Sequence, residues 1–545
     1  MRTPLFRSLR QIVTDLRIAE HRQVPVDVVR EERRRAEERA AAAPRGIGRR
    51  ALLGGAVAAA GALAIGRRAR AGTGNANAEI AIIGGGMAGM ACADHLASYG
   101  ISFKVYEASG RIGGRMYSNN SGYWADGQVS EWGGELIDTN HVTVQSLATD
   151  YGLELDNLLD LQPAGSEELY YAFGAHYGKH QADDDFRAMW EVVKADAQAA
   201  GYPTTHDSYS AHGYALDHLS VHDWIASRVP GGHASRLGRI LDVAYNIEYG
   251  AETYDQSSLN LLYLLAYQPK PVAFASFGES DERYHIRGGN QQLPKAIADS
   301  LPAGTVEHGH KLVRIALTSS GRVKLTFSTS GGTVEKTFDR VALCIPFAML
   351  ADVDYSQAGF DALKVQAIRN LGRGHNGKLQ LQFNRRTWAG TGSWPGIANG
   401  STFSDSGYQC SWEPTRGQAG QSGILNLYSG GSVTDAMKTT VPFATHTNAK
   451  VVQDAQAGLA RIGVVFPGLQ WNGRATQSIW HKNPFTQHSY AFYRVGQYTA
   501  FGGHEGVPQG PIHVAGDHTS QDFQGFMEGA AETGVKAGKE IRQAL

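Results

Sequence analysis

Short apolar runs alternate with helical stretches along the chain, a pattern typical of an α/β fold. Residues 79–83 (Glu-Ile-Ala-Ile-Ile) are almost entirely apolar and predict a buried strand. A glycine-rich turn follows, and then a helical pattern that runs to Ser98, with Gly100 placed to end the helix. Residues 101–106 predict the next strand. This strand–helix–strand order predicts a sheet that is covered by helices.

Further elements are predicted in the second half of the chain. Leu379 to Phe383 alternates apolar and polar side chains as a strand does, and Lys378 opens it. Residues 512–518 predict a strand followed by a turn, and residues 525–543 predict a C-terminal helix.

The composition indicates a globular protein with a distinct N-terminal segment. A length of 545 residues with 42% hydrophobic residues excludes a disordered chain or a disulfide-stapled mini-protein. The net charge of −1 argues against a dedicated nucleic-acid binder. However, sixteen arginines and seven acids give residues 1–71 a charge of +9, which leaves −10 for the rest. Cys92, Cys344 and Cys410 lack metal-ligand spacing, and we expect them to pack as small hydrophobes.

The basic segment, residues 1–71, has the features of an export signal. Arg49 and Arg50 precede the uncharged stretch from Ala51 to Gly66, and Ala69-Arg70-Ala71 supplies a small-x-small cleavage site. The segment resembles a twin-arginine signal, which implies the export machinery as a partner and a periplasmic or extracellular location. The stretch is shorter than the roughly 18 residues of a membrane-spanning candidate, so we expect no permanent membrane span.

The first chemical motif is the glycine-rich turn after the first predicted strand. Gly84, Gly86 and Gly89 fit the pattern G-x-G-x-x-G. Gly84 permits the tight turn, Gly86 lets the backbone approach a pyrophosphate, and Gly89 allows the helix to pack closely on the strand. The helix N-terminus then faces the anion. Glu107 could accept from both hydroxyls of an adenosine ribose and would repel a 2′-phosphate, which favours FAD or NAD(H) over NADP(H).

The residues from Glu107 onward distinguish between these two cofactors. Residues 107–115, Glu-Ala-Ser-Gly-Arg-Ile-Gly-Gly-Arg, match the pattern E-A-x-x-R-x-G-G-R. This motif resembles the signature of the flavin amine oxidases, the superfamily of monoamine, polyamine and L-amino-acid oxidases. Arg111 and Arg115 would place fixed positive charge beside the pyrophosphate. The resemblance implies that the cofactor is FAD.

Later motifs are similar to the same family in the same order. They include the glycine pair at 133–134, the strand at 311–315, the acid at 517 and the closing Gly-Phe-Met-Glu-Gly-Ala at 525–530. The helix that follows the closing motif is expected to direct its positive N-terminus at the flavin. The resemblance implies FAD contacts from Gly84, Gly86, Met87, Ala88, Gly89, Glu107, Ala108, Arg111, Gly114, Arg115, Gly133, Gly134, Glu135, Leu136, Val313, Asp517, Gly525, Phe526, Met527 and Ala530.

The resemblance also implies which residues lie nearest the chemistry. Lys378 corresponds to a lysine that holds a water against flavin N5, where it could orient water for proton transfer or oxygen chemistry. Trp480 lies on the flavin side, while Tyr490 and Phe526 form two walls of an aromatic cage that aligns the amine with N5. Ser489 stands where some members have a flavin-linking cysteine, so we expect noncovalent FAD.

Three residues are substrate candidates. Glu135 follows the glycine pair where snake-venom L-amino-acid oxidases have a carboxylate-clamping arginine, which favours amines without a carboxylate. His488 replaces the usual glycine and could add a titratable donor, although a histidine satisfied by the backbone fits equally well. Arg494, like Arg283 or Arg287, could supply a clamp from another direction, so amino acids stay open as substrates.

The resemblance implies a monoamine-oxidase-like α/β fold with two domains. A discontinuous, Rossmann-like FAD-binding domain is expected from residues 78–137, 284–346 and 501–545. A mixed α+β substrate-binding domain is expected from residues 138–283 and 347–500.

We therefore expect a secreted, FAD-dependent amine oxidase that acts on a primary or secondary amine. The resemblance implies hydride transfer to flavin N5, an imine hydrolysed to an aldehyde and ammonia or an amine, and H2O2 formed from O2. The alternatives are an L-amino-acid oxidase that gives a 2-oxo acid and, in another class, a non-catalytic FAD-binding interaction protein. We predict no metal site and no nucleic-acid partner, and a homodimer stays open.

Overall fold

The computed structural model describes residues 78–268 and 273–545. The predicted export signal in residues 1–71 lies outside these residues. Within them, no helix is both long and apolar enough to cross a membrane.

A five-stranded parallel sheet contains the first predicted strands. Its central strand, β1 (Ile80–Ile83), is wholly buried and pairs with β2 on one side and β13 on the other. Strands from three distant stretches of sequence assemble this sheet. Across it they are β24 (Ile512–Val514), β13 (Arg340–Leu343), β1, β2 (Lys104–Tyr106) and β9 (Val306–Glu307).

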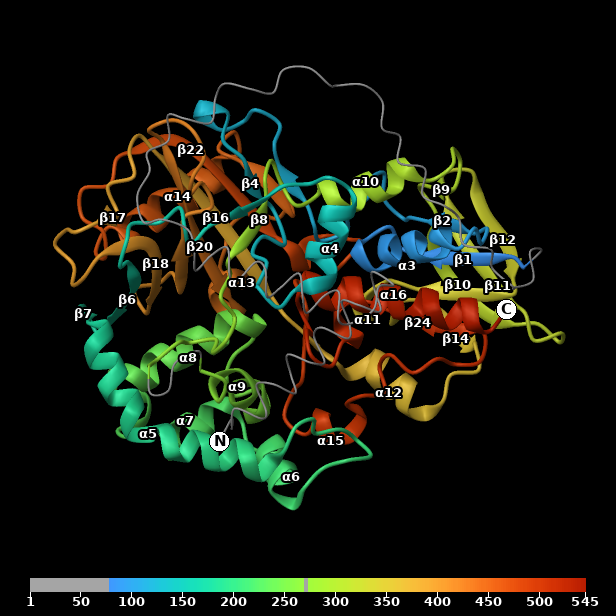
Figure 1. Ribbon diagram of the computed structural model, residues 1–545, viewed down its shortest axis with the longest axis horizontal. Helices are drawn as coiled ribbons and strands as arrows, with labels where there is room; N and C mark the ends of the chain where they lie inside the picture. Colours follow the sequence, from blue (N-terminus) through green and yellow to red (C-terminus); the bar gives the residue numbers. More distant parts are fainter. Residues whose placement is uncertain (1–77, 269–272) are drawn as a thin grey trace, which may run out of the picture. The chain divides into compact units, whose positions relative to one another are not determined.

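Helices α3 (Met87–Ser98) and α16 (Met527–Gln543) pack together on one face of this sheet, although they are far apart in sequence (Figure 1). Glycines on α16 make the contact close. A Cβ atom on Gly534 would lie only 2.2 Å from the carbonyl oxygen of Ala88, and one on Gly538 would lie 3.0 Å from the His95 side chain. These glycines lower helix propensity, and in return they let two helix backbones approach.

A four-stranded sheet packs on the opposite face. Ile80 and Ile82 of β1 contribute to the core under α3, whereas Ala81 and Ile83 contribute to the core of this second sheet, as the alternation of a strand requires. Its strands, in order, are β12 (Gly332–Phe338), β11 (Val323–Thr329), β10 (Lys311–Leu317) and β14 (Asp354–Gln357). Helices α11 (Phe347–Leu350) and α12 (Ala362–Asn370) supply residues to the same core.

The largest sheet has nine strands and is mainly antiparallel. All eight residues of its strand β16 (Asn376–Phe383) are buried, with β20 and β22 paired on its two sides. Helix α14 (Ala449–Ile462) packs on β16 and β22. The order is β21 (Phe443–Thr445), β22 (Trp471–Ile479), β16, β20 (Gly423–Gly430), β19 (Cys410–Trp412), β18 (Ala398–Ser404), β6 (Glu167–Ala172) and β7 (Ala175–Tyr177), with β17 (Ala389–Gly390) on β18.

Helices of residues 179–265 form a cluster beside this large sheet (green in Figure 1), and α8 contacts β6, β18 and β20. Four of these helices begin after a serine whose side chain accepts a backbone N–H, which satisfies a free donor of the first turn. The helices are α5 (Lys179–Ala200), α6 (Ala211–Asp217), α7 (Val221–Arg228), α8 (Arg236–Tyr249) and α9 (Ser258–Leu265).

Shorter elements connect these parts. They are the helices α4 (Val142–Asp150), α10 (Gln292–Ser300), α13 (Gly431–Asp435) and α15 (Gln497–Phe501), and the strand pairs β3 (Ser118–Asn119) with β4 (Ser130–Glu131), β5 (Leu155–Asn157) with β8 (Tyr284–Ile286), and β15 (Gly372–Arg373) with β23 (Ala491–Phe492).

The predicted fold class, α/β with a discontinuous dinucleotide-binding part, is confirmed. Some boundaries differ from the prediction. The strand around Lys378 begins at Asn376, since its first residues already pair with β20, and the second strand begins at Lys104 rather than residue 101. Residues 347–371, which the sequence analysis assigned to the substrate-binding domain, pack in the core of the four-stranded sheet.

Candidate active site

A cavity of about 540 Å³ brings distant segments together. Part of its wall comes from the loops of the five-stranded sheet, between residues 84 and 117 and at 344–346. The nine-stranded sheet and α8 supply Glu248, Tyr249, Asn376, Lys378, Trp412 and Tyr428, and further lining residues lie within 480–491 and 516–530. The cavity is therefore lined by segments predicted to bind FAD and by segments predicted to bind the substrate.

The three glycines of the first turn have different environments. Gly84 has a φ of +103°, and a Cβ atom there would lie 2.6 Å from the carbonyl oxygen of Cys344. A Cβ on Gly89 would lie 1.9 Å from the carbonyl oxygen of Gly84. Around Gly86, by contrast, the nearest heavy atom to such a Cβ is Gly114 Cα at 3.8 Å. The protein itself requires the first and third glycines, whereas the space over Gly86 is open to the cavity.

Two helices begin at the cavity wall. Met87 and Ala88 form the start of α3, Met527 starts α16, and all three line the cavity. Neither helix has a side-chain cap at its N-terminus. Their first backbone N–H groups, with the positive end of each helix dipole, are therefore available to a negatively charged group in the cavity.

Glu107 directly follows β2 and lines the same cavity. Its carboxylate accepts hydrogen bonds from the backbone N–H groups of Gly85 and Ser109, both at 2.7 Å. A carboxylate has about four acceptor sites, so it can also accept from the two hydroxyls of a ribose. Ala108, the next residue, does not line the cavity.

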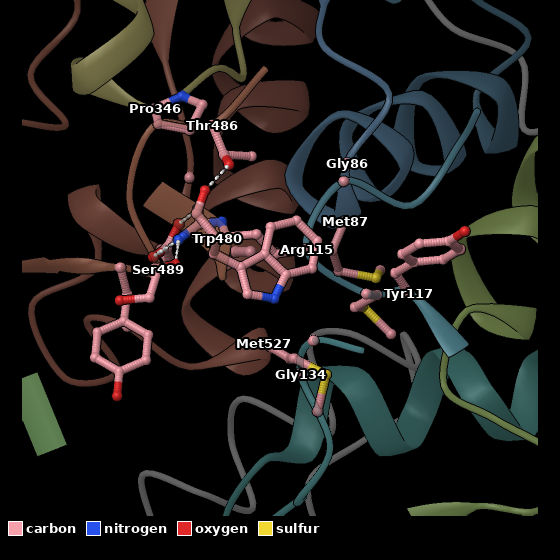
Figure 2. A pocket seen from close by; sticks show the side chains of 18 of the residues that line it. Gly86, Met87, Arg115, Tyr117, Gly134, Pro346, Trp480, Thr486, Ser489 and Met527 are labelled. Carbon is pink, nitrogen blue, oxygen red and sulfur yellow. Dashed lines mark hydrogen bonds and ion pairs between the residues drawn. The ribbon is translucent and has the colours of Figure 1, made fainter. Parts of the chain in front are cut away.

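The two arginines of the signature serve different purposes. Arg111 donates to the carbonyl of Gly114 at 2.6 Å and stacks 4.0 Å over the Tyr117 ring, so it fixes the glycine loop. Arg115 forms an ion pair with Asp517 and donates to the Ser489 carbonyl at 2.7 Å (Figure 2). Burial works to raise the pKa of Asp517, but the Arg115 guanidinium outweighs it and holds that pKa well below its ordinary value.

The second glycine pair packs against protein atoms. A Cβ on Gly133 would lie 1.9 Å from the Arg115 carbonyl oxygen, and one on Gly134 would lie 2.9 Å from the Met527 sulfur. Trp480 donates its Nε1–H to the carbonyl of Trp132 at 2.9 Å. Its indole also lines the cavity (Figure 2). These glycines let the loop, the tryptophan and the start of α16 form one continuous wall.

Lys378 is held in a buried network at this wall. Its Nζ lies 2.5 Å from Glu135 Oε2 and donates to the carbonyl of Gly133 at 2.8 Å. Trp412 donates its Nε1–H to the other oxygen of Glu135 at 2.7 Å. Both carboxylate oxygens of Glu135 therefore already accept from protein donors, so this side chain is not free to bind a substrate. Lys378 keeps a third N–H for a water or a ligand.

The predicted cage residues Tyr490 and Phe526 both line the cavity. The Tyr490 hydroxyl lies 2.9 Å from that of Tyr428 and donates to the carbonyl of Ile247 at 3.0 Å, which fixes its ring. Phe526 makes an edge contact with the His141 ring, with centroids 5.3 Å apart. Both rings are thus held by their surroundings.

Four other predicted residues do not line the cavity, namely Gly89, Val313, His488 and Arg494. His488 is buried, and its Nδ1 lies 3.0 Å from the Thr486 carbonyl. Burial, reinforced by the charge of Arg115, lowers its pKa well below the ordinary value, so it is a neutral histidine satisfied by the backbone. Arg494 is exposed, with its guanidinium 6.0 Å from the Phe492 ring centroid.

Two carboxylates that the sequence analysis missed also line the cavity, Glu248 at the end of α8 and Glu282. Among the described residues, neither side chain has a hydrogen bond or an ion pair. Burial, followed by the charge of Asp138, raises the pKa of Glu248 to about 8 and raises the pKa of Glu282 well above its ordinary value. A signal was present, because Glu248 stands between Ile247 and Tyr249 in a helix that is largely buried.

These features fit FAD. The open space over Gly86 and the uncapped helix starts suit the pyrophosphate, Glu107 suits the adenosine ribose, and the wall of Trp480 and Met527 suits a flat ring. Ser489 offers no thiol for a covalent bond to the flavin.

Comparison with known proteins agrees with this assignment. A sequence profile of the family described as flavin containing amine oxidoreductase matches residues 87–542. The chain is 25% identical to nicotine dehydrogenase of Pseudomonas putida over 508 residues, which cover 90% of this chain and 94% of the relative. It is 25% identical to L-amino acid dehydrogenase of Synechocystis over 479 residues, which cover 86% of this chain and 95% of the relative.

The fold is also similar to that of a solved structure. Putrescine oxidase bound to putrescine superposes with a TM-score of 0.67 over 85% of this chain and 98% of that chain, at 19% sequence identity.

Proposed function

Because this chain belongs to the flavin containing amine oxidoreductase family, with FAD as its cofactor, we propose that it oxidises the C–N bond of a cationic amine that lacks a carboxylate. One observation carries this proposal: the unpaired carboxylates of Glu248 and Glu282 face the cavity. An ammonium group would supply the positively charged partner that these carboxylates lack. A substrate carboxylate would instead add repulsion.

The arginines suited to clamping an amino acid are engaged elsewhere. Arg283 pairs with Asp281, and Arg287 pairs with Asp156, both outside the cavity lining. Arg416 interacts electrostatically with Glu282 but donates to Ser401 and does not line the cavity. Among the described residues, the arginines that line the cavity are those of the cofactor loop, Arg111 and Arg115.

Two free carboxylates further favour a substrate with a second basic nitrogen, such as a diamine. One carboxylate is sufficient to bind one ammonium, and burial holds a second acid in the same cavity protonated unless a cation also reaches it. The name of putrescine oxidase, which shares this fold, supports the same substrate class, as does that of nicotine dehydrogenase, whose substrate has two nitrogens.

When bound, FAD would accept two electrons, as a hydride, from the carbon that bears the amine nitrogen. The protein positions the amine between Tyr490 and Phe526, whose π faces tolerate partial positive charge on nitrogen. In its ionised form, Glu248 or Glu282 can take the proton that an ammonium must lose before oxidation. The free N–H of Lys378 can hold a water in the cavity for hydrolysis of the product imine.

Three matched compounds test this proposal with the purified yellow protein. 1,4-Diaminobutane has one ammonium more than butylamine, and L-ornithine has one carboxylate more than 1,4-diaminobutane. We expect kcat/KM, measured by reduction of an artificial dye, to be highest for the diamine and lowest for ornithine. Replacing Glu248 or Glu282 by glutamine should lower kcat/KM for the diamine by about 10–100-fold, the effect of losing one charge-assisted contact. The kcat/KM for butylamine should change less. Ornithine as the best substrate would contradict the proposal and favour the amino-acid alternative.

Molecular oxygen is the proposed electron acceptor, with H2O2 as the product. Relatives of this chain are named as oxidases and as dehydrogenases. Peroxide formed in stoichiometric amounts with the oxidised amine would support the oxidase assignment. Turnover that requires a dye even in air would assign the enzyme to the dehydrogenases.

Export by the twin-arginine route is also proposed, and its support is sequence alone. Arg49 and Arg50, the uncharged stretch from Ala51 to Gly66, and the Ala69-Arg70-Ala71 site have the required order. Replacing both arginines by lysine should leave the protein in the cytoplasm of its host, as measured by cell fractionation. Unchanged export of that variant would rule out the route.

A further inference from the structure

Three side chains with metal-binding groups meet on a part of the molecule outside the cavity. His375 lies just before β16, Asp435 ends α13, and His481 belongs to the short helix η3 (Trp480–Lys482). Their ligand atoms all lie within 4.8 Å of one another. Asp435 Oδ1 lies 2.9 Å from His375 Nδ1 and 3.5 Å from His481 Nε2. One carboxylate oxygen thus faces an imidazole nitrogen from each histidine.

His481 is poorly satisfied by the protein. Its side chain is only 12% exposed, yet its Nδ1 is buried without a hydrogen-bond partner among the described residues. The distance from its Nε2 to Asp435 is longer than an ordinary hydrogen bond. The nitrogen that faces Asp435, Nε2, therefore lacks an ordinary hydrogen bond and is available to a bound ion.

We propose that His375, Asp435 and His481 form a binding site for a divalent transition metal of the zinc class. Two imidazoles and one carboxylate are ligands that Zn²⁺ accepts, with water able to fill the fourth position of a tetrahedron. Mg²⁺ and Ca²⁺ prefer sites made of oxygen atoms, so this donor set selects against them. The three ligands come from three separate elements, which explains why spacing in the sequence did not indicate the site.

Binding requires one local adjustment. The His375 and His481 rings are stacked, with centroids 4.1 Å apart and planes 18° apart. A metal lies near the plane of each imidazole that binds it, so one ring must tilt for both to share an ion. His375 has room to do so, since its side chain is 38% exposed.

The site would connect two parts of the active-site wall with helix α13. His481 directly follows Trp480, whose indole lines the cavity. His375 directly follows Gly374, whose N–H donates to the carbonyl of the cage residue Tyr490 at 2.8 Å. A metal bound there would tie η3 and the start of β16 to α13, and would restrict the motion of the wall from behind.

The chain offers a matched control. His222 and His233 are also stacked, with centroids 4.1 Å apart and planes 22° apart, and Asp223 lies beside His222. This second pair does not bring three ligand atoms within the same distance as the first group. If stacked histidines alone were sufficient to bind zinc, the second pair would bind it as well.

Isothermal titration of the FAD-loaded protein with ZnCl2 tests the proposal. We expect one saturable site in the wild type and in His222→Ala. Asp435→Asn and His375→Ala should each weaken zinc binding by about 10–100-fold or more. This is the range known for loss of a supporting contact at a metal site. Asp435→Asn changes few atoms, and its thermal unfolding curve shows whether it is folded.

Two results would overturn the proposal. One is the absence of saturable zinc binding in the wild type, and the other is equal affinity in Asp435→Asn or His375→Ala. Because the readout is metal binding, the result does not depend on whether the proposed amine substrate is correct.

Discussion

Lys378 has two roles at the residue scale, and they can be separated. It neutralises the buried carboxylate of Glu135, and it presents a free N–H to the cavity. Removing one partner of a buried ion pair leaves the other charge uncompensated, which typically costs about 3–5 kcal/mol. A loss of activity in a Lys378 variant could therefore reflect a loss of stability alone.

A double variant distinguishes the two roles. We expect Lys378→Met to retain FAD, to lower the melting temperature and to slow turnover by about 100-fold, a typical effect for a group that positions a proton or water. In Lys378→Met with Glu135→Gln, the unpaired charge is removed and an oxygen that accepts from Trp412 is kept. That variant should regain most of the stability and remain slow. Recovery of turnover together with stability would show that the lysine is only structural.

Glu248 predicts how pH affects substrate binding. Burial and then Asp138 raise its pKa to about 8, and Glu282 lines the same cavity. Below pH 8 the carboxyl is mostly protonated and cannot pair with an ammonium group. We therefore expect KM for a cationic amine to fall as the pH rises from 6 to 8.5. Initial rates should show this trend in the wild type and a flatter trend in Glu248→Gln. A KM that rises over this range would contradict the assignment.

The residues that the sequence could identify are those that belong to motifs. Gly84, Gly86 and Glu107 could be interpreted because the dinucleotide turn fixes their spacing. Glu248 and Glu282 belong to no such motif, and only the fold brings them to the cavity. Glu135 was identified as facing the substrate, but its pairing with Lys378, some 243 residues away, could not be known from sequence.

At the scale of elements, the contact between α3 and α16 holds two cofactor-facing helix starts in one place. The contact depends on glycine, since any side chain at Gly534 would meet the backbone of Ala88. Replacing Gly534 by alanine removes a helix-weakening glycine, which alone would stabilise α16. The clash at 2.2 Å involves backbone and cannot be relieved by a rotamer change, so the unfavourable effect is expected to win.

We expect Gly534→Ala to destabilise the protein by about 1–3 kcal/mol, the usual cost of overpacking, and to weaken FAD binding. The melting temperature and the flavin fluorescence released on dilution measure the two effects. Gly178→Ala is the control, because a Cβ there meets no atom within 4 Å and its φ is −66°. Equal melting temperatures and equal flavin release in Gly534→Ala and Gly178→Ala would show that the contact between α3 and α16 tolerates a side chain.

Elements were predicted well where pattern and turn chemistry agree. The first strand and helix and the C-terminal helix lie within about two residues of the expected positions. The nine-stranded sheet was not predicted as a unit, because its strands pair across long stretches of sequence and leave no local signal. The packing of residues 347–371 with the four-stranded sheet was missed for the same reason, since β14 pairs with β10 only in the folded chain.

For the whole molecule, the sum of charges conceals two different parts. Residues 1–71 carry +9, and the rest carries −10. An excess of acid in the enzyme part is compatible with cationic substrates, and the structure locates some of that acid inside the cavity, at Glu248 and Glu282. Buried acids also make the stability of the molecule depend on pH.

The sign of this dependence follows from the groups that titrate between pH 6.5 and 8. Burial raises the pKa of Glu505 and of Glu528 to about 7, and that of Glu248 to about 8, all above the about 4.3 of an unfolded glutamate. The folded state thus binds more protons than the unfolded state in this range, so stability falls as pH rises. Histidines with lowered pKa, such as His141 at about 3, oppose this slope near pH 6.5, where an unfolded histidine is about half protonated, and add little slope toward pH 8.

We therefore expect the melting temperature of the FAD-loaded enzyme to fall between pH 6.5 and 8. The fall should end near pH 8, because burial lowers the pKa of Lys364 to about 8 and adds an opposite slope above that value. Glu248→Gln should show a shallower fall, since an amide does not titrate. A cationic amine paired with Glu248 should raise the melting temperature more at pH 8 than at pH 6.5, because only the ionised carboxylate binds it. Thermal unfolding at four pH values, with and without 1,4-diaminobutane, measures all of these effects, and a melting temperature that rises over this range would contradict the buried-acid account.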